Sequence, residues 1–190
     1  MNLLTKTTDL AMYLCLSYIK EGDIVIDATC GNGNDTLALS EAVGQDGTVM
    51  AFDIQNQAIE TTRALMQHHG KDNCLLILDS FVNMGKYVDA EEGRPSACIF
   101  NLGYLPNGDK GITTDIDSSM LGVKAALELI KPGGVVVITM YQGHEAGKIE
   151  KEELLKFAGD LPKSIYHCVY LNMINQSNNP PEILAITKKK

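Results

Sequence analysis

The sequence contains no tryptophan, and aromatic residues make up only 6% of its 190 residues. It also lacks a long apolar run: the apolar stretch near the N-terminus carries Asp9 and is too short to cross a bilayer. No basic start followed by a small-residue cleavage site is present, so we expect neither a signal peptide nor a membrane segment. These absences predict a cytoplasmic protein.

Cysteine pairs with C-x-x-C spacing are also missing, which leaves no support for a zinc ribbon or a dithiol redox motif. We therefore expect no metal cofactor. The cysteines are widely spaced, and their odd number fits a reducing compartment. They are Cys15, Cys30, Cys74, Cys98 and Cys168.

Basic residues are few, since 16 Lys and Arg face 24 Asp and Glu and give a net charge of -8. The overall charge thus gives no support to nucleic-acid binding, although it is compatible with a local basic patch. Four lysines are candidate phosphate contacts, although they are better explained as ordinary solvated side chains: Lys6, Lys110, Lys148 and Lys151. With 45% apolar residues, the length suits one domain spanning residues 1–190.

Apolar periodicity predicts a helix near the N-terminus, with Thr7 or Thr8 as its N-cap, followed by alternating strands and helices. Five strands are expected at 24–26, 48–52, 74–78, 97–100 and 135–139, and helices at 35–43, 56–69, 81–89, 115–130 and 149–158. Two further strands, 166–172 and 183–187, have no helix between them. The pattern predicts an α/β fold with a mostly parallel seven-stranded sheet, helices on both faces and an antiparallel C-terminal edge hairpin.

The stretch "VIDATCGNGNDT", residues 25–36, places two glycines between the first strand and its helix. A ligand can press against the backbone at Gly31 and Gly33 because no Cβ intrudes, and the amides of the helix start point outward. Asp53 ends the second strand twenty residues after Gly33, a spacing that suits hydrogen bonds to a ribose diol. A simple turn is the alternative for the glycines.

Two cofactor classes fit this turn. An NAD site needs a third glycine, and that position holds Thr36. Asn32, Asn34 and Asp35 precede it, and an acid would repel a pyrophosphate but attract an ammonium group. S-adenosylmethionine carries an ammonium and a ribose but no phosphate, so the residues favour it.

Asp79 ends the third strand in "LLILDSF", where it could accept a hydrogen bond from an adenine amino group. The alternative is that Asp53 and Asp79 cap the helices that follow them. Together, the polar residues at three successive strand ends favour a nucleoside-type cofactor over these local roles.

The segments "VIDATCGNGNDT", "AFDIQ" and "LDS" resemble the first three motifs of class I S-adenosylmethionine-dependent methyltransferases. The common form of the first motif has a glycine where this chain has Thr29, a departure that resembles a small bacterial rRNA-methylase-like family. The likeness extends through "NLGYLP", "PGG", "YQGHEAG" and "NNPPEILAI". It implies a Rossmann-like fold and S-adenosylmethionine as cofactor. The candidate cofactor-binding residues are Asp27, Gly31, Asn32, Gly33, Asn34, Asp35, Asp53, Gln55, Asp79 and Ser80.

The fourth strand ends in "CIFNLGYLPNGDK", with Asn101 at its tip. In amino-group methyltransferases with a similar arrangement, an Asn or Asp precedes small or proline residues and an aromatic. The resemblance implies that Asn101 Oδ1 and the carbonyl of Leu102 accept N–H groups of an amine, and that Tyr104 stacks on the acceptor ring. A strand-end turn capped by Asn101 is the alternative.

His144, in "YQGHEAG", is the candidate general base for an amine that arrives as an ammonium. Glu145 would orient this histidine or hold a cationic substrate. A histidine in a surface loop is the alternative interpretation.

The resemblance implies a tRNA methyltransferase that methylates the aminomethyl group of wobble 5-aminomethyl-2-thiouridine. Separately, we expect that a homodimer supplies extra surface for the RNA. Methylation of rRNA, of a small amine or of a protein by the same fold stays open. A NAD-linked reductase and a catalytically silent binding module are further alternatives, and the missing third glycine disfavours the reductase.

Overall fold

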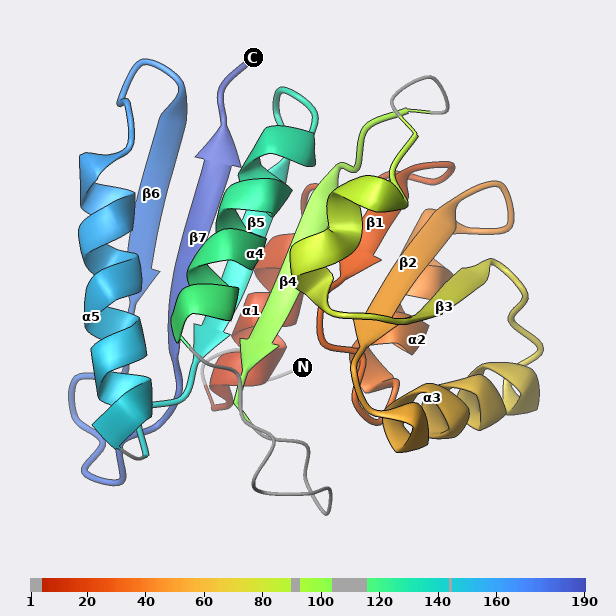
Figure 1. Cartoon of the computed structure of the whole chain (residues 1–190), viewed down its shortest axis with the longest axis horizontal. Helices are drawn as coiled ribbons and strands as arrows, with labels where there is room; N and C mark the ends of the chain where they lie inside the picture. Colours follow the sequence, from red (N-terminus) through yellow and green to blue (C-terminus); the bar gives the residue numbers. More distant parts are fainter. Residues whose placement is uncertain (1–4, 90–92, 104–115, 144) are drawn as a thin grey trace.

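The computed structural model describes residues 5–89, 93–103, 116–143 and 145–190. Seven strands form a sheet in the order β3-β2-β1-β4-β5-β7-β6 (Figure 1). Their bounds are β1 Ile24–Asp27, β2 Thr48–Asp53, β3 Cys74–Leu78, β4 Ala97–Leu102, β5 Val135–Met140, β6 Tyr166–Leu171 and β7 Glu182–Lys188. The first five strands pair in parallel.

The C-terminal strands form the predicted antiparallel hairpin, and β7 rather than β6 joins the parallel part of the sheet. Residue Met140 of β5 pairs with Glu182 of β7, while Tyr166 of β6 pairs with Lys188 at the other end of β7. The last strand of the chain is therefore an inner strand, and β6 is an edge strand.

Helices cover both faces of the sheet because successive side chains of a strand point to opposite faces. Val25 contributes to a core with α1, α2 and α3, whereas Ile26 contributes to a core with η1, α4 and α5. Figure 1 shows α4 and α5 in front of the sheet and α1 and α2 behind it. The bounds are α1 Thr7–Leu16, α2 Asn34–Val43, α3 Asn56–His68, η1 Phe81–Lys86, α4 Ile116–Leu129 and α5 Glu145–Asp160.

Two local expectations were wrong. The N-cap of α1 is Lys6, which makes no side-chain cap, instead of Thr7 or Thr8. The helix expected at 81–89 is a 3-10 helix that ends at Lys86. Asn83 within it and Tyr87 just after it both donate side-chain hydrogen bonds to Asp79.

The parallel strands bring their carboxyl ends to one edge of the sheet, the lower edge in Figure 1. Asp27, Asp53 and Asn101 lie in or at the ends of β1, β2 and β4, and Asp79 follows β3. In such sheets ligands bind at this edge, so the fold gathers the predicted site residues on the expected side. Within the described ranges, no helix combines the length and apolarity needed to cross a membrane.

Candidate functional site

The glycine turn after β1 folds back toward the end of β2. Gly31 and Gly33 have φ angles of 50° and 83°, a left-handed backbone that favours glycine. The N–H of Gly33 donates to the carbonyl of Cys30 at 2.7 Å, which tightens the turn. The N–H of Gly31 donates to Oδ2 of Asp53 at 3.1 Å. The structure therefore brings Gly31 and Asp53 into direct contact, as their places at neighbouring strand ends predicted.

The absence of a side chain at Gly33 has an internal cause. A Cβ at this position would lie 3.0 Å from both Cα and Oγ1 of Thr62 on α3. Thr62 Oγ1 also donates to the carbonyl of Gly31 at 3.2 Å. The close packing of α3, together with the left-handed backbone, accounts for glycine at 33 without a ligand.

Asp53 does not cap the helix that follows it. The N-cap of α3 is Gln55, and no side chain caps that helix. Asp53 instead accepts the N–H of Gln55 at Oδ1, 2.9 Å away, while its second oxygen accepts from Gly31. Ile54, between them in sequence, is 56% exposed and gives the site an apolar surface beside this carboxylate.

Asp27 is fully buried beneath the turn and accepts two hydrogen bonds. Thr29 N–H donates to its Oδ1 at 3.1 Å, and Thr36 Oγ1 donates to its Oδ2 at 2.6 Å. Where an NAD motif would have its third glycine, this chain has Thr36, and its hydroxyl binds Asp27 within the turn. Burial and the neighbouring Asp35 raise the pKa of Asp27 to about 7.

Asn101 connects β4 to the glycine turn through two contacts. Its backbone N–H donates to Thr29 Oγ1 at 2.8 Å, and its side-chain Nδ2 donates to Oδ2 of Asp35 at 2.5 Å. Thr29 thus supplies a hydroxyl that a glycine at this position would lack. A carboxylate accepts only, so the bond to Asp35 assigns the NH₂ group and turns Oδ1 of Asn101 away from Asp35.

The carboxylates around the turn form a negative cluster. Burial raises the pKa of Asp35 and of Asp53 above the usual range, as it does for Asp27. Asp35 also lies in the first turn of α2. Partly buried carboxylates near one another repel an anionic ligand and gain from a cationic one. The arrangement fits a ligand with an ammonium and a sulfonium better than one with a pyrophosphate.

Asp79 and Ser80 lie at the next strand end and make mainly local contacts. Asp79 Oδ1 accepts from Ser80 N–H and Asn83 Nδ2, and its Oδ2 accepts from Tyr87 at 3.0 Å. The bond from Asn83, followed by the one from Tyr87, lowers the pKa of Asp79. Ser80 caps η1 by accepting the N–H of Val82. The alternative role predicted for Asp79, capping the helix that follows, therefore belongs to Ser80.

Other predicted site residues take different positions. Asn32 and Asn34 are exposed on the glycine turn. Glu145 begins α5 and pairs with Lys148 at 3.2 Å on the same helix, with 80% of its side chain exposed. Tyr104, His144 and Lys110 lie outside the described residues.

Sequence reasoning missed Tyr141, the first residue after β5. A Cβ on Gly103 would lie 3.4 Å from Cδ2 of Tyr141, so the ring packs against the residue that follows β4. Burial, followed by the charge of Asp35, raises the pKa of the Tyr141 hydroxyl. The charge of Asp35 therefore acts on this hydroxyl. The sequence feature that could have identified Tyr141 is its position at a strand end, directly before the "QGHEAG" segment.

Metal ligation finds no support in the part of the chain that the structure describes. There, no group of three or more His, Cys, Asp or Glu side chains is arranged to hold a metal ion.

Comparison with known proteins gives close matches along nearly the whole chain. A chloroplastic tRNA (mnm(5)s(2)U34)-methyltransferase of Arabidopsis thaliana is 39% identical over 184 residues, covering 92% of this chain and 67% of that protein. The crystal structure of a putative rRNA-methylase from Clostridium thermocellum is 37% identical, with a TM-score of 0.93, and covers 97% of this chain and 98% of that one.

A putative methyltransferase from Streptococcus mutans, crystallised in complex with SAH, is 32% identical with a TM-score of 0.87. That match covers 97% of this chain and 99% of that one, and it confirms the predicted Rossmann-like methyltransferase fold. The family model described as "Putative rRNA methylase" matches residues 49–187. The chain therefore belongs to this rRNA methylase family.

Proposed function

We propose that this protein methylates the exocyclic aminomethyl group of wobble 5-aminomethyl-2-thiouridine in tRNA. The observation that carries the proposal is the 39% identity, over 92% of the chain, to a relative named for methylation at U34 of tRNA. The broader activity follows from the family and its SAH-complexed member: the chain is an S-adenosylmethionine-dependent methyltransferase.

The glycine turn and the neighbouring strand ends would hold S-adenosylmethionine. Asp53 would accept from the ribose hydroxyls, and the exposed Ile54 would cover one face of the adenine ring. The negative charge of Asp35 would attract the cationic methionine part. These assignments agree with the electrostatic preference of the site for a cation.

Contacts at the glycine turn itself complete this cofactor site in our proposal. Gly33 is buried against Thr62, so the ligand would contact the backbone of Gly31, the exposed Asn32 beside it and the exposed Asn34 at the start of α2. Further contacts would come from Gln55 after β2 and from Asp79 and Ser80 after β3. The fully buried Asp27 would act through the Thr29 and Thr36 groups that donate to it.

Asn101 would aim the acceptor amine. Because its Nδ2 bonds Asp35, its Oδ1 remains to accept an N–H of the amine and direct the nitrogen lone pair. Bound S-adenosylmethionine supplies a methyl whose bond to sulfur breaks as the bond to nitrogen forms, leaving S-adenosylhomocysteine. In our proposal, His144 accepts a proton from the arriving ammonium before this transfer, which frees the nitrogen lone pair. Glu145 orients His144, and Tyr104 stacks on the base.

The family description favours a second candidate substrate, rRNA. Methyl acceptance by purified tRNA and rRNA, both from a strain that lacks this protein, separates the two. We expect label from S-adenosylmethionine in tRNA, as 5-methylaminomethyl-2-thiouridine after nuclease digestion. Label in rRNA or in small metabolites, with none in tRNA, would overturn the proposed substrate.

We further propose that residues 1–190 act as one domain, in the cytoplasm, and as a homodimer. The free cysteines in the described ranges support a reducing compartment. A second copy would enlarge the surface available to RNA. Light scattering with and without tRNA would test the assembly, and a monomer in both conditions would exclude the dimer.

A further inference from the structure

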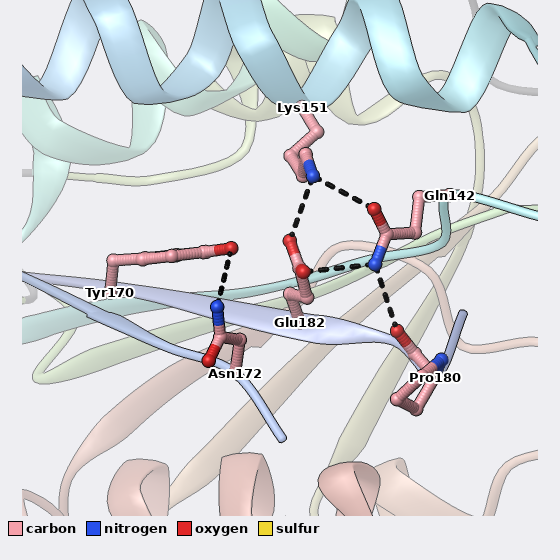
Figure 2. A network of polar contacts seen from close by, with 6 residues as sticks. All are labelled: Gln142, Lys151, Tyr170, Asn172, Pro180 and Glu182. Atoms are coloured by element: carbon pink, nitrogen blue, oxygen red, sulfur yellow. Dashed lines mark hydrogen bonds and ion pairs between the residues drawn. The ribbon is translucent and has the colours of Figure 1, made fainter. Parts of the chain in front are cut away.

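A closed set of polar contacts holds the chain where it leaves β5. Gln142 Nε2 donates to Oε1 of Glu182 at 2.9 Å, and Gln142 Oε1 accepts from Lys151 Nζ at 2.8 Å (Figure 2). Lys151 Nζ also lies 3.2 Å from Oε2 of Glu182. The three residues, called here the β5-exit network, come from the end of β5, from α5 and from the start of β7.

The network is buried enough to hold one geometry. Side-chain exposure is 18% for Lys151 and 8% for Glu182. Oε2 of Glu182 accepts no hydrogen bond from the described residues, so its contact with Lys151 is an electrostatic ion pair. A buried carboxylate is costly without its cationic partner, and each member therefore constrains the other two. The expectation of a solvated lysine at 151 was wrong.

The network also joins two segments that are far apart in the sequence. Gln142 belongs to "YQGHEAG", whereas Glu182 belongs to "NNPPEILAI". A weaker bond, 3.4 Å long, runs from Gln142 Nε2 to the carbonyl of Pro180 (Figure 2). The connection before β7 and the connection after β5 are thus fixed to each other.

Tyr141 directly precedes Gln142 in the chain, so the bonds that fix Gln142 also restrict the backbone of Tyr141. Because Leu102 pairs with Met140, the next residues, Gly103 and Tyr141, lie side by side beyond the ends of β4 and β5. Tyr141 is partly buried, and its ring packs on Gly103. Asn101 pairs with Thr139, so by the two-residue alternation of strands Tyr141 lies on the same face of the sheet as Asn101, which would receive the acceptor.

We propose that Tyr141 forms one wall of the subsite for the target base, and that the β5-exit network positions it there. This inference rests on the proposed function, since the base to be stacked is the pyrimidine of the tRNA. The flat ring of a tyrosine can stack on a nucleobase, and such stacking is tolerant of the base's substituents. Tyr141 touches the substrate in this arrangement, whereas Gln142 acts through Tyr141.

Steady-state methylation of tRNA by four proteins tests the inference: wild type, Tyr141→Ala, Gln142→Ala and the double variant. Loss of one stacked base should lower kcat/KM for tRNA about 5- to 100-fold in Tyr141→Ala. Its Kd for S-adenosylhomocysteine, measured by calorimetry, should equal that of wild type. Gln142→Ala should lower kcat/KM severalfold, and it should cause no further loss in the Tyr141→Ala background.

Tyr18→Ala is the matched control, because Tyr18 is 38% exposed just beyond the end of α1, remote from β4 and β5 exits. Equal kcat/KM for Tyr141→Ala and this control would overturn the inference. So would a larger change in S-adenosylhomocysteine affinity than in tRNA kinetics, or additive effects of the two substitutions. A wild-type protein that methylates no tRNA would instead refute the proposed function, and this inference with it.

Discussion

The two sides of the site are held together by different means. On the glycine-turn side, residues 27–36 and 53–55, short-range backbone geometry and carboxylate contacts set the shape. On the β5-exit side, residues 141–142 with Lys151 and Glu182, side chains from three separate elements set it. The glycine-turn side thus suits the binding of one cofactor, S-adenosylmethionine.

If the two sides act separately, substitutions on the glycine-turn side should change the cofactor Kd, and those near the acceptor should change kcat for tRNA methylation. Asn101→Ala should have the largest effect, a fall in kcat of about 100-fold, because misplacing a nucleophile is costly in a direct displacement. Its Kd for S-adenosylhomocysteine should change little. Single-turnover methylation of tRNA and calorimetry measure the two quantities. A change mainly in cofactor affinity would assign Asn101 to the glycine-turn side.

Asp53→Ala should affect cofactor affinity instead. Loss of a charged acceptor for the ribose, and of its bond to the Gly31 N–H, should raise the Kd for S-adenosylhomocysteine about 10- to 100-fold. The kcat at saturating cofactor should stay close to wild type. Asp72→Ala, an exposed carboxylate before β3, is the control. Unchanged affinity in Asp53→Ala would contradict the ribose assignment.

The buried Asp27 should make stability depend on pH. Its pKa of about 7 exceeds the unfolded value of 3.8, so between these values the folded state retains a proton that the unfolded state has lost. The free energy of unfolding should therefore fall as pH rises, by about 2 kcal/mol between pH 5.5 and 7 from this group alone.

Asp27→Asn should remove this part of the slope, while an amide at 27 can still accept from Thr29 N–H and donate to Thr36 Oγ1. Urea unfolding at the two pH values measures the difference, with the exposed Asp46→Asn as control. Equal slopes in wild type and Asp27→Asn would mean that Asp27 is ionised throughout.

The smallest effect concerns Thr29, whose hydroxyl links the glycine turn to Asn101. Thr29→Val keeps the side-chain shape but leaves the N–H of Asn101 without its acceptor, and should lower kcat about tenfold. Thr29→Ser retains the hydroxyl and should stay near wild type. If Val and Ser variants behave alike in the methylation assay, the hydroxyl has no part in placing Asn101.

Much of the glycine-turn side could be predicted because its parts are close in sequence or follow from strand ends. The contact between Gly31 and Asp53 is an example, since adjacent parallel strands place their carboxyl ends together. The cause of glycine at 33 could not be predicted, because Thr62 approaches it from α3. The sequence shows that residue 33 has no side chain, but it does not show that Thr62 occupies the space beside it.

The sequence by itself determined the alternation of strands and helices, the C-terminal hairpin and the row of polar residues at the strand ends, because these depend on local periodicity and spacing. Only the tertiary structure decided that β7 lies inside the sheet and that Gln142, Lys151 and Glu182 meet. The physical reason is that a buried ion pair is specified by packing between distant segments, and a single lysine or glutamate in a sequence does not reveal its partner.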